Sequence, residues 1–196
     1  MPALTGVVSA RAGRRITSQS GRSFVVTEPA AVAVRLEPAT ADDVGEITAL
    51  RTAVAQDLTG RHGAGHWSAT VTERGVMRGI TTSRVLVVRH ASRIVATLRL
   101  ATKKPWAIDI AYFTPCSRAL YLTDMAVHPS TQHQGIGRRC LDEARRIGAD
   151  WPADAIRLDA YDAPAGAGGF YARCGFQEVG RVTYRNTPLI YFEAAL

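Results

Sequence analysis

Hydrophobic residues fall into strand-like and helix-like patterns from residue 32 onward. Over residues 32–36, apolar side chains alternate with small or charged ones, which is the two-residue period of a half-buried strand. A helix that ends near Gly60 is predicted next, because apolar residues recur at helical spacing and Thr40 and Asp43 resemble a capping box. The apolar positions of this helix are Ile47, Leu50, Val54 and Leu58.

The remaining pattern predicts strands that alternate with helices. Two β-rich runs over 85–100 read as a hairpin, and an amphipathic helix over 135–147 is expected to stop at Gly148. Further strands are expected at 120–127, 156–158, 178–184 and 189–192, with short helices at 72–78 and 169–174. No internal repeat is visible. The predicted fold class is therefore α/β, with a mixed sheet.

The first thirty residues differ in composition from the remainder. They are rich in Gly, Ser, Arg and Ala and contain no acidic residue before Glu28. Such a segment resembles an organellar transit peptide, but a poorly ordered extension is the simpler interpretation. We therefore expect residues 1–30 to form a flexible N-terminal extension and residues 31–196 to form a single domain.

Composition restricts the class of protein. The 196 residues are 46% hydrophobic and 21% charged, which excludes a wholly disordered or collagen-like chain. No apolar run approaches the roughly 18–20 residues that span a bilayer, and the N-terminus lacks the apolar region of a secretory signal. Three scattered cysteines and five histidines lack the spacing of a disulfide framework or a metal site. We expect a cytoplasmic protein with reduced thiols, no membrane partner and no bound metal.

The net charge of +7 comes almost entirely from arginine. Of 24 basic residues, only Lys103 and Lys104 are lysines. A modest positive charge suits a nucleic acid and a small phosphorylated ligand equally well. The arginines are dispersed and no nucleic-acid recognition motif is present, so a nucleic-acid partner is not expected.

A glycine-bearing loop over 132–138 separates a predicted strand from the amphipathic helix. The first N–H groups of a helix have no intrahelical partner and lie at the positive end of its dipole, and glycine lets an anion approach them. The loop therefore predicts a phosphate or pyrophosphate cradle, with an ordinary strand–helix turn as the alternative. It is not a Walker loop, which requires a lysine, nor a dinucleotide fingerprint, whose third glycine is replaced by Cys140.

Two segments resemble motifs of the GNAT superfamily of N-acetyltransferases. The run Val127–Gly137 is similar to the acetyl-CoA-binding pattern V-x-P-x-x-Q/R-x-x-G-x-G/A, and Phe170–Phe176 is similar to the helix end that follows the fifth strand. The resemblance covers roughly residues 32–196. It implies the GNAT-like acyl-CoA N-acyltransferase fold, a central, mostly antiparallel sheet with a splayed pair of parallel strands and flanking helices.

The resemblance also implies an acetyl-CoA site. Backbone groups of Met125, Ala126 and Val127 would bond the pantetheine amides as an added strand does. The loop that follows would hold the pyrophosphate, through Gln132, His133, Gln134, Gly135, Ile136, Gly137 and Arg138. An asparagine that often follows the fifth strand in the family is replaced here by Pro164, and whether Asp162 takes its place stays open.

The resemblance implies that Tyr171 acts as a general acid. A phenol at this place can protonate the departing CoA thiolate, although an aromatic side chain there also suits core packing. A protonated amine must lose a proton before it attacks, and Asp124, on the strand beside the acetyl site, is the predicted base, directly or through water. Asp124 is equally suited to satisfying backbone groups in the splayed sheet. Asp109 and Glu193 are weaker candidates for the base.

An acceptor pocket is expected near the irregular segment 103–117. Trp106, Asp109 and Tyr112 are the candidate substrate contacts, although the two aromatic side chains suit packing as well. The predicted function is transfer of an acetyl group from acetyl-CoA to a primary amine of a small molecule or peptide, by direct attack in a ternary complex. The alternative is a non-catalytic module that binds acyl-CoA or nucleic acid; Tyr171 favours the enzyme, because a pure binder needs no proton donor. The acceptor's identity and the oligomeric state, a homodimer included, stay open.

Overall fold

A seven-stranded mixed sheet organises the chain. The computed structural model describes residues 34–196, so the extension expected at residues 1–30 lies outside the described part. The strand order is β1-β2-β3-β4-β5-β7-β6, and all neighbours pair antiparallel except β4 and β5. This arrangement confirms the predicted fold class. The strands are β1 (Glu37–Pro38), β2 (Arg84–His90), β3 (Arg93–Ala101), β4 (Ala119–Val127), β5 (Ala155–Tyr161), β6 (Gln177–Tyr184) and β7 (Thr187–Ala195).

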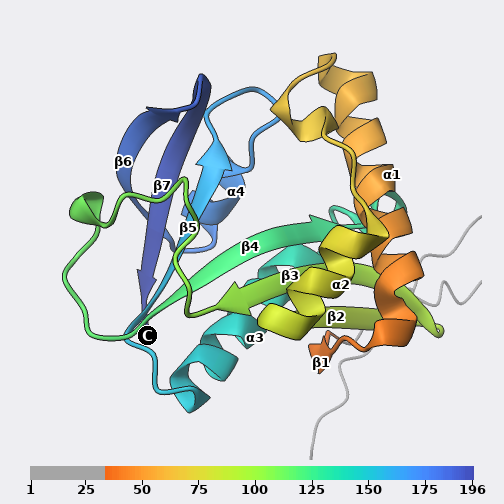
Figure 1. Cartoon of the computed structure of the whole chain (residues 1–196), viewed down its shortest axis with the longest axis horizontal. Helices are drawn as coiled ribbons and strands as arrows, with labels where there is room; N and C mark the ends of the chain where they lie inside the picture. The colour runs from red at the N-terminus through yellow and green to blue at the C-terminus, as the bar shows by residue number, and fades with distance from the viewer. Residues whose placement is uncertain (1–33) are drawn as a thin grey trace, which may run out of the picture. The chain divides into compact units, whose positions relative to one another are not determined.

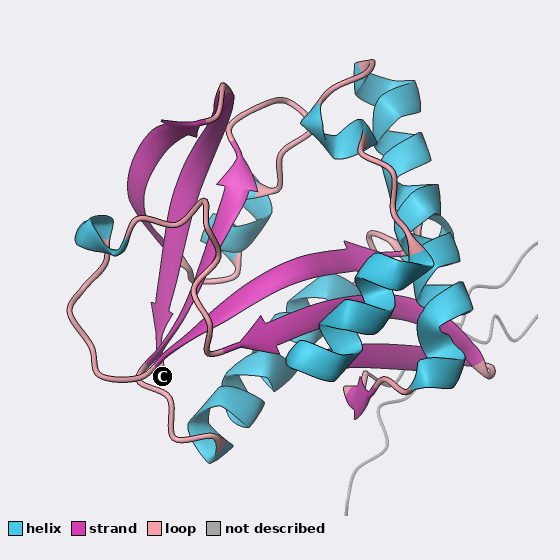
Figure 2. Cartoon of the chain, viewed as in Figure 1, coloured by secondary structure: helices cyan, strands magenta, loops and turns pink. Residues whose placement is uncertain are grey.

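Helices cover both faces of the sheet. Figure 1 shows α1 and α2 in front of β2 and β3, with α3 behind the sheet, and Figure 2 shows the same layers coloured by type. The helices are α1 (Val44–His62), α2 (Glu73–Thr82), α3 (Ile136–Asp150) and α4 (Gly168–Arg173). Within residues 34–196, no helix is both long and apolar enough to cross a bilayer.

Three apolar clusters hold these layers together. On the α3 face, Leu141 packs with Leu98, Leu120 and Ile156 of the strands. On the opposite face, the cluster joins side chains of α1 and α2 to β2 and β3: Ile47, Leu50, Val76, Val85, Val87 and Ile94. A third cluster seats the segment between β3 and β4 on β4 and β7: Ile108, Phe113, Tyr121, Leu189 and Tyr191.

Two sequence expectations about elements are wrong in the described residues. Residues 34–36 are not a strand, because pairing with β2 begins only at Glu37, while Leu36 is buried without a ladder partner. Gly148 does not stop α3, which continues to Asp150. Glycine is needed there for packing, since a Cβ would lie 2.6 Å from a methyl carbon of Leu196.

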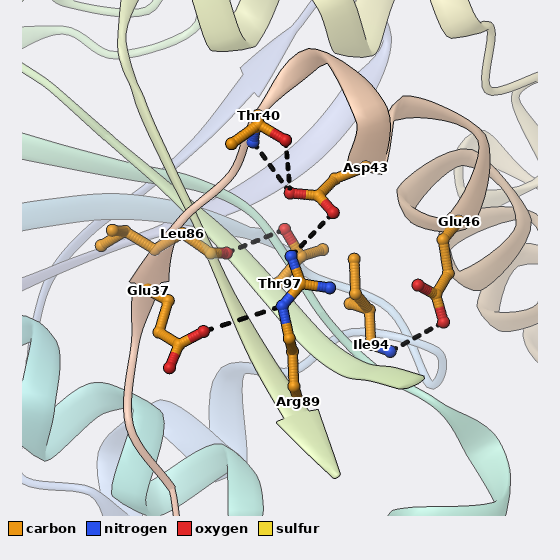
Figure 3. A network of polar contacts seen from close by, with 8 residues as sticks. All are labelled: Glu37, Thr40, Asp43, Glu46, Leu86, Arg89, Ile94 and Thr97. Atoms are coloured by element: carbon orange, nitrogen blue, oxygen red, sulfur yellow. Dashed lines mark hydrogen bonds and ion pairs between the residues drawn. The ribbon is translucent and has the colours of Figure 1, made fainter. Parts of the chain in front are cut away.

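Asp43 fixes the start of α1 to the β2–β3 hairpin, as Figure 3 shows. Its carboxylate accepts hydrogen bonds from the backbone N–H of Thr40 (2.8 Å) and from the guanidinium of Arg89 on β2 (2.7 Å). One turn later, Glu46 accepts the backbone N–H of Ile94 on β3 at 2.8 Å. The capping interaction expected between Thr40 and Asp43 is confirmed for the hydrogen bond in which the Asp43 carboxylate accepts the backbone N–H of Thr40.

Replacing Asp43 with Asn is expected to lower the free energy of unfolding at pH 7 by about 1–3 kcal/mol. Burial of Asp43 opposes its ionisation, but the hydrogen bonds from Arg89 and Thr40 outweigh burial and lower its pKa. A lowered pKa adds stability above the unfolded-state value near ~3.9, and this contribution disappears as the pH falls through the lower folded-state pKa. Urea unfolding from pH 2 to 7 measures the loss. Asp42→Asn, an exposed neighbour, is the control and should change stability little.

Candidate active site

β4 and β5 separate after a short parallel ladder. They pair only at Ala119–Ala155, Leu120–Ile156 and Tyr121–Arg157, and beyond these pairs the two strands run apart, as Figure 1 shows. Residues 122–127 of β4 therefore have a neighbouring strand on the β3 side but none on the β5 side. This gap is the splayed pair that the resemblance implied.

A bulge in β4 lies at the gap. Asp124 has a φ of +55°, and the register shifts so that three steps along β4, from Thr123 to Ala126, match two along β3. Further along, the backbone N–H of His128 donates to Val95 O of β3 at 2.9 Å. Because backbone groups alternate between the two edges of a strand, Met125 and Val127 face the gap and Ala126 faces β3. Of the three predicted pantetheine-binding positions, two are thus directed towards the gap.

The carboxylate of Asp124 is held by two guanidinium groups. Its Oδ1 accepts from Arg51 of α1 at 2.7 Å, and its Oδ2 lies 3.3 Å from Nε of Arg99 on β3. Both arginines tie the bulge to α1 and β3. The sequence left open a structural role in which Asp124 satisfies backbone groups of the splayed sheet, whereas its ion-pair partners are these two side chains. Its role as general base stays a prediction.

The glycine loop after β4 adopts the conformation of a helix-entrance cradle. Gly135 is the N-cap of α3 with a φ of +77°, and His133 also has a positive φ, +61°. The first hydrogen bond within α3 runs from the N–H of Arg139 to Gly135 O. The N–H groups of residues 136–138 come before this bond, so they have no acceptor within the helix. They lie at the positive end of the dipole of a fifteen-residue helix.

The two glycines of the loop serve different purposes. A Cβ at Gly135 would meet nothing within 4 Å, so this glycine is needed for its backbone conformation. A Cβ at Gly137 would lie 3.1 Å from the ring of Phe170, so that glycine lets α3 pack against α4. Gln132 braces the loop by donating from its side chain to Val127 O at 3.0 Å.

Tyr171 of α4 directs its hydroxyl towards the gap. The side chain is buried, its ring contacts Phe176 and Phe192, and its Oη lies 3.9 Å from the sulfur of Met125 on β4. Burial raises the pKa of Tyr171, and the nearby negative charge of Asp159 raises it further. The phenol therefore keeps its proton at neutral pH and has that proton available to donate.

Asp159 is a functional candidate that the sequence analysis missed. It lies on β5 beyond the last β4 pair, opposite Tyr191 of β7, and burial raises the pKa of its carboxyl group. Its charge also contributes to the raised pKa values of Tyr161, Tyr171 and Tyr191. The available signal was an acidic residue between Leu158 and Ala160 in the middle of a central strand.

The predicted substrate residues separate into two places. Trp106 is 85% exposed and borders a groove beside α2. Asp109 instead accepts the backbone N–H of Ala111 at 3.0 Å, and the ring of Tyr112 packs edge-on against Tyr191. Asp109 and Tyr112 thus lie where the segment turns onto β7, not among the residues that line the groove.

A buried ion pair anchors the segment that carries Trp106. Nε of Arg157 on β5 lies 2.8 Å from Oε2 of Glu193 on β7, and both side chains are buried. Arg157 also donates to Thr114 O, while the backbone N–H of Thr114 donates to Glu193 Oε1 at 3.2 Å. Glu193, a weaker candidate for the base, is therefore occupied in holding this segment on the sheet.

The two remaining predictions concern Asp162, the possible substitute for the family's asparagine, and metal ligands, which are not expected. Asp162 forms an ion pair with Arg181 at 2.9 Å, so its carboxylate is engaged by β6. Within the described part of the chain, no group of three or more His, Cys, Asp and Glu side chains is arranged to hold a metal ion.

Comparisons with solved structures find the same fold in many acetyltransferases. A GNAT-family acetyltransferase from Listeria monocytogenes superimposes with a TM-score of 0.66 and 17% identity, over 93% of this chain and 100% of that chain. A GNAT-family acetyltransferase from Streptococcus agalactiae gives 0.67 and 11%, over 83% and 95%. The ribosomal-protein-S18-alanine N-acetyltransferase of Escherichia coli gives 0.61 and 14%, over 83% and 94%. At these identities the likeness shows the fold.

Sequence comparison identifies the family. No curated protein sequence matches the chain. The family model for the acetyltransferase (GNAT) domain matches residues 81–178, which is half of the chain and includes β4, the glycine loop, α3 and Tyr171. The chain therefore belongs to the GNAT family of acetyltransferases.

Proposed function

We propose that this protein transfers an acetyl group from acetyl-CoA to a primary amine of a small molecule or peptide, by direct attack in a ternary complex. The observation that carries the proposal is one continuous arrangement along β4. An unpaired strand edge faces the gap, a phosphate cradle follows at the end of the strand, and a protonated phenol points at Met125 between them.

The residues present fit acetyl-CoA. The gap-facing backbone groups of Met125 and the N–H of Val127 match the amides of pantetheine, which pair with a strand edge as another strand would. The N–H groups at the start of α3 match the pyrophosphate, because they are unpaired donors at the positive end of a helix. Arg138 and Arg139, in the first turn, add positive charge beside the same loop. No metal is invoked.

We assign the two proton transfers of the reaction to two side chains, Asp159 and Tyr171. When bound, acetyl-CoA supplies the acetyl group as a thioester, so that the C–N bond to the amine forms and the C–S bond breaks. Asp159 takes the proton that the amine loses, because a carboxylate of raised pKa is a better base than an ordinary aspartate. Tyr171 holds a proton at its Oη for the departing sulfur. The nitrogen loses a second proton as the amide forms, and this proton restores the Tyr171 phenol, so that the one proton released overall leaves Asp159 to solvent.

We place this chemistry in the cytoplasm. Cys116 is an exposed free thiol, and Cys140 and Cys174 are also free in the described part of the chain. Free exposed thiols persist in reducing compartments. An acyl-CoA-binding module without turnover would keep the cradle but would not need a protonated phenol directed at Met125, so Tyr171 supports the enzyme.

Replacing Gly135 with Val is expected to weaken acetyl-CoA binding at least tenfold. The new side chain would extend into the open space in front of the cradle and would also strain a backbone at positive φ. Isothermal titration calorimetry measures the affinity. Gly63→Val is the matched control, since Gly63 has a φ of +78° and equally open space but caps α1. Equal affinities of the two variants would exclude the loop as the pyrophosphate site.

Replacing Tyr171 with Phe is expected to lower kcat by about 10²–10⁴-fold, the usual contribution of general acid catalysis. The ring contacts remain, so the affinity for acetyl-CoA should change little. Steady-state kinetics with an accepted amine, together with calorimetry, separate the two effects. A kcat within about threefold of wild type would make Tyr171 a packing residue.

Replacing Asp159 with Asn is expected to lower kcat by about 10²–10⁴-fold and to remove the acid limb of the pH profile of kcat/KM. A base must be ionised, so wild-type activity should fall as the pH drops through a pKa above the ordinary ~3.9 of aspartate. Asp142→Asn, an exposed carboxylate on α3, is the control. If Asp124→Asn removes the limb in a folded protein and Asp159→Asn does not, Asp124 is the base.

A further inference from the structure

A groove runs between α2 and the segment that follows β3. Its walls include Arg78 of α2 and Lys103, Lys104 and Trp106 of that segment, and its floor includes Arg99 of β3 and Tyr121 and Thr123 of β4. We call it the basic groove. It lies beside the N-terminal half of β4, whereas the phosphate cradle follows the opposite end of the strand.

The basic groove carries four cationic side chains and no acidic one in its lining. Both lysines of the chain are among them, and within residues 34–196 neither Arg78 nor Lys103 forms an ion pair. Lys104 donates to the carbonyl oxygen of Ile108 at 2.6 Å, which fixes its ammonium group without neutralising it. The groove therefore has an excess of positive charge that the side chains of residues 34–196 do not neutralise.

A negative charge, that of Asp124, lies beside the part of the basic groove formed by Arg99 and Thr123. There Nε of Arg99 donates to Thr123 Oγ1 at 2.8 Å and lies 3.3 Å from Asp124 Oδ2. Thr123 precedes Met125 by two residues, or ~7 Å along a strand. The lining of the groove thus reaches to within two residues of Met125, which borders the gap where the proposed reaction takes place.

We propose that the basic groove binds an anionic group of the acceptor. The acceptor is then a primary amine that carries a carboxylate or phosphate, with the acid roughly 7–13 Å from the amine, the distance from Met125 back to Thr123 and Tyr121 along β4. Guanidinium and ammonium groups form charge-assisted hydrogen bonds with such anions, and Trp106 offers an exposed apolar surface at the rim. Polyamines, which carry only positive charge, are repelled. This inference rests on the proposed acetyl transfer.

The test compares acceptors that differ only in charge. One pair is a tripeptide amide with glutamate at its second position and the same peptide with glutamine there. A second pair is 6-aminohexanoate and 6-aminohexanamide, whose extended chain reaches the required separation and which distinguishes a small acceptor from a peptide. Calorimetric affinity with and without CoA is measured for each, alongside CoA release with acetyl-CoA. We expect the acidic member of at least one pair to bind about 5–30-fold tighter, with a preference that weakens as salt rises.

Two double variants test which positive charges bind the anionic group of the acceptor. In the double variant Arg78→Gln/Lys103→Gln, the preference for the acidic acceptor should fall to within about twofold. The change should appear in KM and not in kcat, and the affinity for acetyl-CoA should stay unchanged. Arg74→Gln/Arg93→Gln removes the same charge from exposed positions outside the groove and should keep the preference. Lys104 is left intact, because its bond to Ile108 supports the segment.

The outcomes separate the two proposals. Failure of wild-type protein to bind acetyl-CoA overturns the proposed function. If acetyl-CoA binds but neither pair shows a preference for its acidic member, the acetyl-transfer proposal stands and the anion-binding groove is wrong. A preference that survives Arg78→Gln/Lys103→Gln also overturns the groove assignment. Loss of acetyl-CoA affinity in that variant would instead assign the groove to the cofactor.

Discussion

The early end of the β4–β5 ladder is the constraint on which the rest of the structure depends. Three residue pairs hold the strands together, and every later residue of β4 has one edge unpaired. An unpaired edge inside a sheet is costly unless a ligand or water satisfies its N–H and C=O groups. The bulge at Asp124 and the ion pairs to Arg51 and Arg99 keep the strand in this shape without a partner on the β5 side.

Two carboxylates near the gap differ in environment. Asp124 lies between two guanidinium groups, whereas burial raises the pKa of Asp159. The charge of Asp124 also contributes to the raised pKa of Asp159. One carboxylate can therefore stabilise the bulge while the other exchanges a proton, and neither must do both.

The sequence was informative wherever the physical cause was local. The hairpin, the amphipathic face of α3 and the conformation of the glycine loop each follow from neighbouring residues, and the family resemblance added the splayed pair. Gly148 was misread because its reason is a contact with Leu196, which no local pattern contains. Asp159 was missed for the same kind of reason, since its raised pKa arises from burial in the folded sheet and from the charge of Asp124 on another strand. The ion pairs of Asp124 likewise join three distant elements.

The anchoring of the segment between β3 and β4 has a consequence for the order of folding. The glycine loop and α3 depend on contacts between near neighbours in the sequence, which form early and at small entropic cost. The groove wall depends instead on Glu193, which lies 79 residues after Thr114 and must first pair with Arg157 on another strand. The glycine loop and the start of α3 can therefore form during folding before the segment between β3 and β4 has a defined shape.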